Sequence, residues 1–200
     1  MPLGLRLLER LNFTLYPASR MVGDTLGDWI RRLREQRNLT LRALAEQTGF
    51  SPSFLSQVET GQASPSLSSM ERIATALGVT LGQFFHAAEG SVRPVVRRDA
   101  RPKITSQWSK AEIEGLGSGD PGVRLEPILV TLEPGATSGN SAHASPRDQF
   151  AFVLEGEVTL THAQLDHVMT AGDSATIRSG IPRRWRNDST QPARIVIVEG

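Results

Sequence analysis

The chain has 200 residues, of which 38% are hydrophobic and 22% charged, and its formal net charge is +1 at pH 7. Such a composition is typical of a globular protein with one large core or two small ones, and it excludes a polycation that binds nucleic acid by overall charge. The sequence contains no cysteine, which excludes disulfides, thiolate metal sites and cysteine nucleophiles. No apolar run approaches the length of a membrane span, so we expect a cytoplasmic protein.

Residues 1–22 precede the first clearly patterned helix. The stretch "MPLGLRLLERLNFTLYPASR" is briefly amphipathic but lacks the long apolar centre and the small-residue cleavage site of a signal peptide. We therefore expect a poorly ordered extension or the product of an upstream start codon.

Residues 23–87 show helical spacing of apolar residues throughout, which predicts five helices. The first helix carries Leu26, Ile30 and Leu33 on one face. Thr40 is the predicted N-cap of the second helix, which ends at Gly49, and "SPSFLSQVE" supplies a third helix. A fourth helix follows Ser66, and a short fifth begins at Thr80.

Helix, short glycine turn and second helix form the geometry that places a helix in a DNA major groove. The exposed side chains predicted on the second of these helices are short polar groups that can contact bases or phosphates, namely Ser51, Ser53, Ser56 and Gln57. Thr40 and Ser51 lie at helix N-termini, where backbone amides favour a phosphate. A helical hairpin with ordinary caps explains the same residues without DNA, so spacing alone leaves both interpretations open.

The motifs "LTLRALAEQTG", "SPSFLSQVETG", "SPSL" and "IATALGV" make residues 26–85 resemble the Cro/repressor-type (XRE-family) helix-turn-helix of bacterial transcription regulators. The resemblance implies that the "SPSFLSQ" helix reads the groove and that Thr40 and Arg42 lie near the DNA backbone. It also implies a homodimer on a palindromic operator, because one such head makes few base contacts.

After about residue 90 the apolar segments become short and turn signals frequent, which predicts an all-β sandwich or barrel. We take "RPVVRRDARPK", from residue 93, as its first strand with a charged outer face; a DNA-contacting arm is the alternative. The expected organisation is an extension at 1–22, a helical domain at 23–87, a linker at 88–92 and a β domain at 93–200.

Two segments of the β domain, "EPGATSGNSAH" with "FAFVLEGEVTL" and then "AGDSATIRSGIPRRWRN", resemble the two motifs of the cupin family. This implies a double-stranded β-helix, or jelly-roll, barrel. Metal-binding cupins use two histidines and a glutamate from the first motif and a histidine from the second. Those positions carry His143, Ser145, Gln149 and Arg183 here, so one ligand of four is kept. Arginine is a permanent cation that repels a divalent metal, and we expect neither metal nor other cofactor.

The same residues predict a different use of the cavity. Arg183, pointing inward beside His143, Ser145 and Gln149, would bind a carboxylate or phosphate, and Trp185 would supply an aromatic wall. The competing interpretation places Arg183 on the surface within the basic cluster "RRWR".

Three functions follow. The leading hypothesis is a DNA-binding transcriptional regulator, not an enzyme and without catalytic residues, whose β domain binds a small-molecule effector and dimerises. The alternative is a metal-dependent cupin oxygenase or isomerase with an attached helix-turn-helix. In the third hypothesis, the helix-turn-helix binds another protein instead of DNA, and the barrel has a purely structural role.

Overall fold

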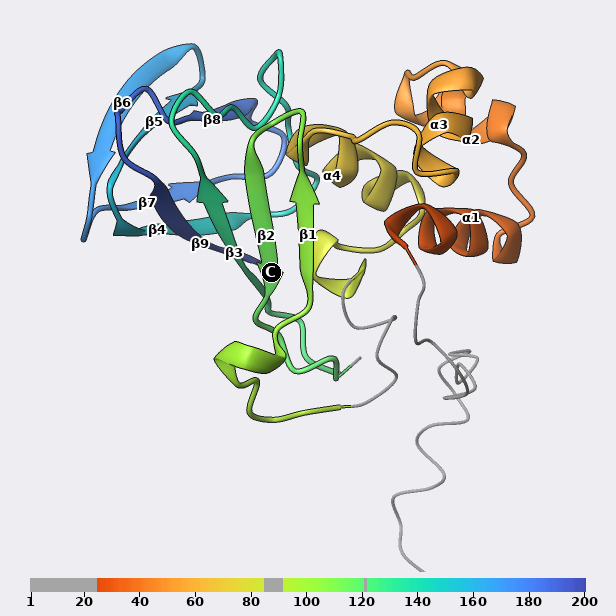
Figure 1. The fold of residues 1–200 in the computed structure, drawn as a ribbon, viewed down its shortest axis with the longest axis horizontal. Coiled ribbons are helices and arrows are strands. Elements are labelled where there is room, and N and C mark those ends of the chain that lie inside the picture. Colours follow the sequence, from red (N-terminus) through yellow and green to blue (C-terminus); the bar gives the residue numbers. More distant parts are fainter. Residues whose placement is uncertain (1–24, 85–91, 121) are drawn as a thin grey trace, which may run out of the picture.

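The computed structural model describes residues 25–84, 92–120 and 122–200. The predicted extension at 1–22 and all of the predicted linker except residue 92 lie outside these residues. A helical part and a β part lie side by side, with helix α4 next to the strands (Figure 1). Within the described residues, no helix is both long and apolar enough to cross a bilayer.

Four α-helices are fully described, and residues 81–84 are helical as well. They are α1 (Leu26–Gln36), α2 (Leu41–Thr48), α3 (Pro52–Glu59) and α4 (Leu67–Ala76). Each of the four begins after a serine or threonine whose side-chain oxygen accepts a hydrogen bond from a backbone amide in the first turn. The predicted caps Thr40 and Ser51 are confirmed, and Ser66 caps the fourth helix that was predicted to follow it.

The turn between α2 and α3 depends on Gly49, whose φ of 67° is the left-handed conformation that glycine adopts without strain. Leu44 on α2 and Leu55 on α3 are completely buried where the helices cross. Arg34 of α1 makes a two-fold contact with Glu59 of α3, with Nε–Oε1 at 2.7 Å and Nη2–Oε2 at 2.9 Å. The pair fixes α1 against the end of α3.

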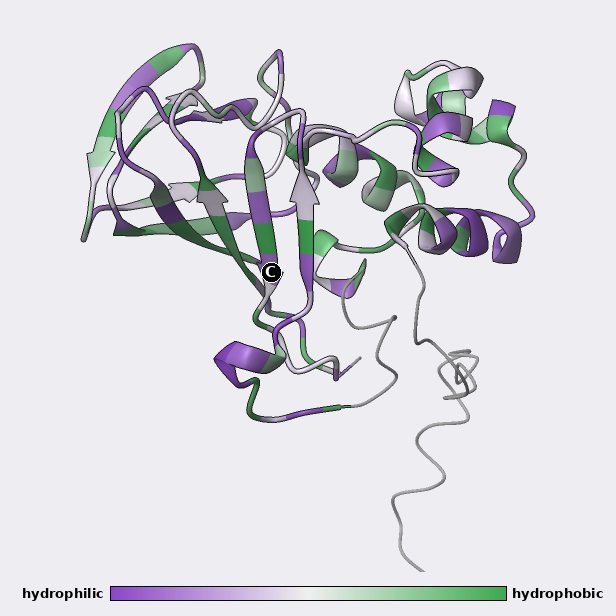
Figure 2. Ribbon diagram, in the orientation of Figure 1, coloured by the Kyte–Doolittle hydropathy of each residue, from purple (hydrophilic) through white to green (hydrophobic). Residues whose placement is uncertain are grey.

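Nine strands are present in the described part of the β domain. They are β1 (Lys103–Ser106), β2 (Ala111–Gly115), β3 (Glu126–Leu132), β4 (Gln149–Glu155), β5 (Glu157–His162), β6 (Leu165–Thr170), β7 (Ser174–Ile177), β8 (Arg183–Arg186) and β9 (Ala193–Glu199). One sheet has the order β1-β2-β3-β9-β4-β7 and the other β6-β5-β8. Hydrophobic and hydrophilic bands alternate along β2 in Figure 2 because glutamates alternate with apolar residues in its sequence, AEIEG.

The two sheets do not close into one hydrogen-bonded barrel within the described residues, which leaves the predicted closed barrel unconfirmed. The segment between β3 and β4 forms no continuous ladder with β8; its β-bridges to that strand are isolated, Thr137 with Arg186 and His143 with Arg183. Turn residues such as Gly135 interrupt regular pairing there. The predicted strand from residue 93 was wrong: a short 3₁₀ helix, η2 (Arg98–Ala100), precedes the first strand at Lys103.

Helix α4 joins the two domains. The amide of Ser68 donates to the carbonyl of Ser138 at 2.8 Å, and the hydroxyl of Ser106 donates to the carbonyl of Pro65 at 2.8 Å. The amide of Gln107 donates to Ser64 Oγ at 3.2 Å. Because these bonds hold the start of α4, a change in the β domain at this point reaches the helical domain directly.

Candidate functional site

The outer surface of α3 presents the polar side chains predicted to read DNA. Ser51, Ser53 and Gln57 are exposed and Ser56 is half-buried. Ser51 Oγ accepts from the amide of Phe54 at 3.1 Å and lies 3.0 Å from Ser53 Oγ, so both hydroxyls gather at the N-terminus of the helix. The helix therefore carries neutral donors and acceptors, without a carboxylate among them, on its solvent face.

Thr40 and Arg42 stand at the start of α2. Thr40 is exposed and caps the helix through the amide of Ala43 at 3.1 Å. The side chain of Arg42 is 86% exposed, and its Nε lies 3.5 Å from Glu46. An ion pair this exposed is weak, so the guanidinium can turn to a phosphate at little cost.

A cavity of about 110 Å³ lies at the junction of the two domains. The helical domain contributes Glu71 and Thr75 from α4 and Leu81 from the next helix. His143, Ser145 and Glu199 contribute from the β domain. A molecule bound there would touch both domains at once.

A row of polar residues crosses the sheet at this end of the β domain. Glu199 on β9 lies opposite Glu126 on β3 and opposite Gln149 on β4. The amide of Gln149 and the hydroxyl of Ser145, the latter at 3.3 Å, both donate to Glu199 Oε1. Two residues further along the strands, the corresponding row is buried and apolar and consists of Ile128, Ile197 and Ala151. The polar side chains of the first row therefore stay at one end of the sheet.

Burial raises the pKa of both carboxyl groups in this row. The pKa of Glu199 is raised first by burial and then by the negative charge of Glu71. Burial also raises the pKa of Glu126 to about 6, against a hydrogen bond from Gln83 that lowers it. Glu199 can thus bind a proton more readily than an exposed carboxylate, and in that state it becomes a hydrogen-bond donor.

Arg183 lies inside the protein, with 4% of its surface exposed. Its Nη1 donates to the carbonyl of His143 at 2.9 Å and its Nη2 to Glu71 Oε1 at 2.9 Å. Since Glu71 belongs to α4, the guanidinium of the β domain is neutralised by a carboxylate of the helical domain. Sequence reasoning placed Arg183 near the cavity but missed this partner, because 112 positions separate the two residues.

His143 is uncharged at neutral pH. Burial, followed by the positive charges of Arg183 and Arg72, lowers its pKa to about 4. Its Nε2 is buried and has no hydrogen-bond partner among the described residues, and the same holds for Gln149 Oε1 and Arg183 Nε. Buried polar atoms are normally paired. His143 lines the cavity whereas Gln149 and Arg183 do not, so among these three atoms His143 Nε2 is the one suited to a bound molecule.

The residues at the four metal-ligand positions of cupins do not fit a metal. Ser145 and Gln149 direct hydrogen atoms at Glu199, and Arg183 brings a buried cation to the place of a histidine. In the part of the chain that the structure describes, no group of three His, Asp or Glu side chains could hold a metal ion.

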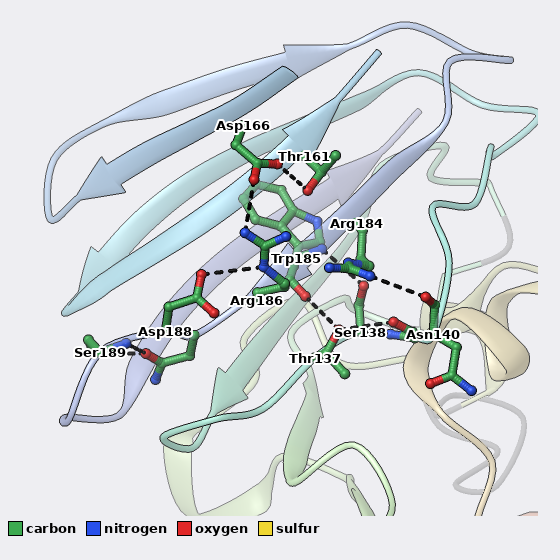
Figure 3. Close-up of polar contacts among 12 residues, drawn as sticks. Thr137, Ser138, Asn140, Thr161, Asp166, Arg184, Trp185, Arg186, Asp188 and Ser189 are labelled. Carbon is green, nitrogen blue, oxygen red and sulfur yellow. Dashed lines mark hydrogen bonds and ion pairs between the residues drawn. The ribbon is translucent and has the colours of Figure 1, made fainter. Parts of the chain in front are cut away.

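Buried and partly exposed side chains alternate along strand β8. Figure 3 shows the contacts of Arg184, Trp185 and Arg186. Trp185 is buried, at 2% exposure, and its backbone bonds to Ser138 in both directions. Arg184 donates to the carbonyl of Asn140 at 3.1 Å, while Arg186 pairs with Asp166 at 2.9 Å and with Asp188 at 3.3 Å. The cluster "RRWR" thus divides into an inward pair, Arg183 and Trp185, and two arginines held by surface groups.

Comparison with known proteins gives two family matches. A helix-turn-helix model matches residues 30–84, and a cupin domain model matches residues 128–199. The HTH-type transcriptional regulator PuuR of Escherichia coli (strain K12) is 30% identical over 172 residues, which cover 85% of this chain and 91% of that protein. This chain belongs to the HTH-type transcriptional regulators. The regulator has an XRE-type helix-turn-helix followed by a cupin domain, as the sequence predicted.

Two further proteins resemble the regulator along most of its length. The HTH-type transcriptional regulator SutR of Escherichia coli (strain K12) is 25% identical over 167 residues, covering 83% of this chain and 89% of its own. A crystal structure of an HTH_3 family transcriptional regulator from Vibrio cholerae has a TM-score of 0.70 at 23% identity, covering 88% and 94% of the two chains. The relatives named here are regulators, not enzymes.

Proposed function

We propose that the regulator binds a palindromic operator as a homodimer and that a small molecule in the junction cavity changes its affinity for DNA. Ser51, Ser53, Ser56 and Gln57 would contact bases in the major groove, while Thr40 and Arg42 would contact phosphates. The proposed organisation is an extension at 1–22, a DNA-binding head at 23–87, a linker at 88–92 and a cupin sensor at 93–200. The proposed compartment is the cytoplasm.

One observation carries the effector part of the proposal: the walls of the cavity come from the cupin domain and from α4 of the head. A ligand bound there interacts with both, and a ligand shifts an equilibrium only through such differential contacts. His143 and Ser145 line the cavity and would contact the ligand directly. Gln149 and Arg183 do not line it but bond to Glu199 and Glu71, which do, and the predicted aromatic wall, Trp185, is not among the lining residues.

We further propose that the effector is anionic. Arg183 is the buried cation of the site, and Glu71 already occupies one of its nitrogens at 2.9 Å. A carboxylate or phosphate would compete with Glu71 for the guanidinium. The raised pKa of Glu199 helps, because its protonated form donates to an anion instead of repelling it.

The homodimer would form through the outer face of the six-stranded sheet. Phe150 and Leu154 on β4 are 45% and 43% exposed, and Phe150 lies opposite Val198 on β9. Burying such a surface against a second copy would place two α3 helices for two half-sites of one operator.

The metal-dependent enzyme is not proposed further, because a serine, an amide and a buried guanidinium occupy the positions that ligands would need. The protein-association alternative differs from the leading function in a measurable way: only the leading function requires sequence-specific DNA binding.

The test is selection of DNA from a random library by the full-length protein, followed by fluorescence-anisotropy titration of the selected sequence. We expect a palindromic consensus, and a loss of roughly tenfold or more in affinity for Gln57→Ala if Gln57 makes a bidentate base contact. Gln191→Ala, at an exposed glutamine of the cupin domain, is the matched control and should bind like wild type. Failure to enrich any sequence would overturn the proposed function.

A further inference from the structure

Helix α4 carries two neighbouring residues that face different parts of the molecule. Glu71 reaches into the cupin domain and pairs with Arg183, the two side chains being 12% and 3% exposed. Arg72 reaches into the head: its Nη2 donates to the carbonyl of Thr48, the last residue of α2. Successive residues of a helix point about 100° apart, which is why one turn of α4 can serve both contacts.

The second contact lies at the turn of the helix-turn-helix. The guanidinium of Arg72 stacks over the ring of Phe50, with Cζ 4.4 Å from the ring centroid. Thr48, Gly49 and Phe50 form the turn, and Ser51 begins α3. A cation held over an aromatic face and bonded to a carbonyl at a helix end fixes the local backbone. Arg72 therefore determines where α3 starts relative to α2.

We propose that Glu71 and Arg72 form the coupling element between the effector cavity and the DNA-reading helix. A molecule that takes Arg183 from Glu71 releases the turn of α4 that carries Glu71 from the cupin domain, and the shift of this turn moves Arg72 and with it Thr48 and Phe50. This inference rests on the proposed effector function of the cavity, since it names how occupation of that site is transmitted.

The ion pair of Glu71 with Arg183 is buried, so breaking it costs free energy. A buried carboxylate that loses its cation either moves to water or binds a proton. Glu71 lines the cavity, so a carboxylate released from Arg183 has the cavity beside it. The bonds of Ser64, Pro65 and Ser68 to the cupin domain hold the beginning of α4, so the helix can pivot there.

Spatial continuity alone does not demonstrate coupling, and a double-mutant cycle does. Glu71→Gln removes the charge of Glu71 while keeping its size, and so imitates the loss of the ion pair without any ligand. Arg72→Gln removes the second contact. The readout is hydrogen–deuterium exchange at the amides of residues 49–55 in the full-length protein, which requires no DNA.

We expect Glu71→Gln to speed exchange at these amides by roughly fivefold, within the range of coupled networks. In an Arg72→Gln background the same substitution should have no further effect on exchange, because the contact of Arg72 with Thr48 and Phe50 is already absent. Glu112→Gln, which removes an exposed ion pair with Lys103 on the cupin domain, should leave exchange unchanged. Unchanged exchange in Glu71→Gln, or equal effects with and without Arg72, would overturn the inference.

The outcomes also separate this inference from the proposed function. If the wild-type protein selects no DNA sequence while Glu71→Gln still speeds exchange at the turn, the DNA function fails and the coupling stands. If the protein selects an operator and Glu71→Gln leaves the exchange rate at the turn unchanged, only the coupling is overturned.

Discussion

Gln149 and Glu199 face each other on adjacent antiparallel strands, and the amide of Gln149 donates a hydrogen bond to the carboxylate of Glu199. Metal-binding cupins have a carboxylate at the position of Gln149. Here the carboxylate stands one strand away, on β9, where Ser145 and Gln149 both donate to it. The site is therefore built around hydrogen bonds between side chains instead of a central ion, and its behaviour should follow from the charges of Glu71, Glu126, Glu199 and Arg183.

The first prediction concerns pH and Glu126. Its folded-state pKa of about 6 exceeds the ordinary 4.5, so the folded protein holds a proton that the unfolded chain has released between these values. The associated stabilisation is fully present below pH 4.5 and is lost as the pH rises through 6. Relative to Glu126→Gln, the free energy of unfolding of the wild-type protein should fall by on the order of 2 kcal/mol between pH 4.5 and just above pH 6.

The difference between the two proteins is the quantity to measure, by urea unfolding at several pH values. His143, with a pKa lowered to about 4, makes the free energy of unfolding rise with pH between 4 and 6.5. Both proteins contain His143, so subtracting one free energy from the other removes this contribution. Glu133→Gln, an exposed carboxylate just after β3, is the control. A wild-type minus Glu126→Gln difference that is flat with pH would contradict the assignment.

A second prediction concerns the buried ion pair between the domains. Arg183→Gln should destabilise the protein by about 3 kcal/mol, because it leaves the carboxylate of Glu71 without a cation. The double variant Glu71→Gln/Arg183→Gln should be more stable than Arg183→Gln alone. Urea unfolding measures both, and Arg31→Gln, which breaks an exposed pair with Glu35 on α1, should cost less than about 1 kcal/mol. A double variant no more stable than the single one would show that the two side chains do not interact.

Metal content provides a third prediction. Protein purified without chelator should contain far less than stoichiometric transition metal by elemental analysis, because the side chains at the ligand positions are poor donors or cationic. The triple variant Ser145→His/Gln149→Glu/Arg183→His restores the ligand types of metal-binding cupins and should gain a metal. Stoichiometric metal in the wild type would refute our interpretation of these positions.

The fourth prediction tests the proposed dimer. Phe150→Glu places a charge on the outer face of β4 and should convert a dimer to a monomer in light scattering coupled to size-exclusion chromatography. Val168→Glu, at a valine that is 65% exposed on β6 of the other sheet, should leave the mass unchanged. A dimeric Phe150→Glu variant would place the interface elsewhere.

The helical half was predictable from sequence because its signals are local. Serine or threonine caps, Pro52 at the first position of α3 and the glycine at position 49 each act within a few residues of where they stand. The cupin half was predictable in its longer strands and in its turns but not in its first two strands: the charged segment from residue 93 contains a 3₁₀ helix instead, and β2, AEIEG, contains no apolar run.

The candidate site was only partly predictable. His143, Ser145, Gln149 and Arg183 could be named because a family pattern marks their positions, and Trp185 because it lies two residues from Arg183 on the same face of a strand. Glu71 and Glu199 could not, since no local pattern distinguishes a half-buried glutamate on α4 or at the end of β9 from a surface one. Their role arises from the docking of α4 and from strand register, both of which join residues far apart in sequence.

The most direct test of the whole account is the operator affinity of wild type, Glu71→Gln and Glu112→Gln, measured by fluorescence anisotropy on the selected DNA at one fixed salt concentration. We expect Glu71→Gln to change the dissociation constant by roughly fivefold or more, the size expected for allosteric coupling, while Glu112→Gln matches wild type. Identical affinities for all three proteins would contradict it, because the cavity between the domains would then have no influence on DNA binding.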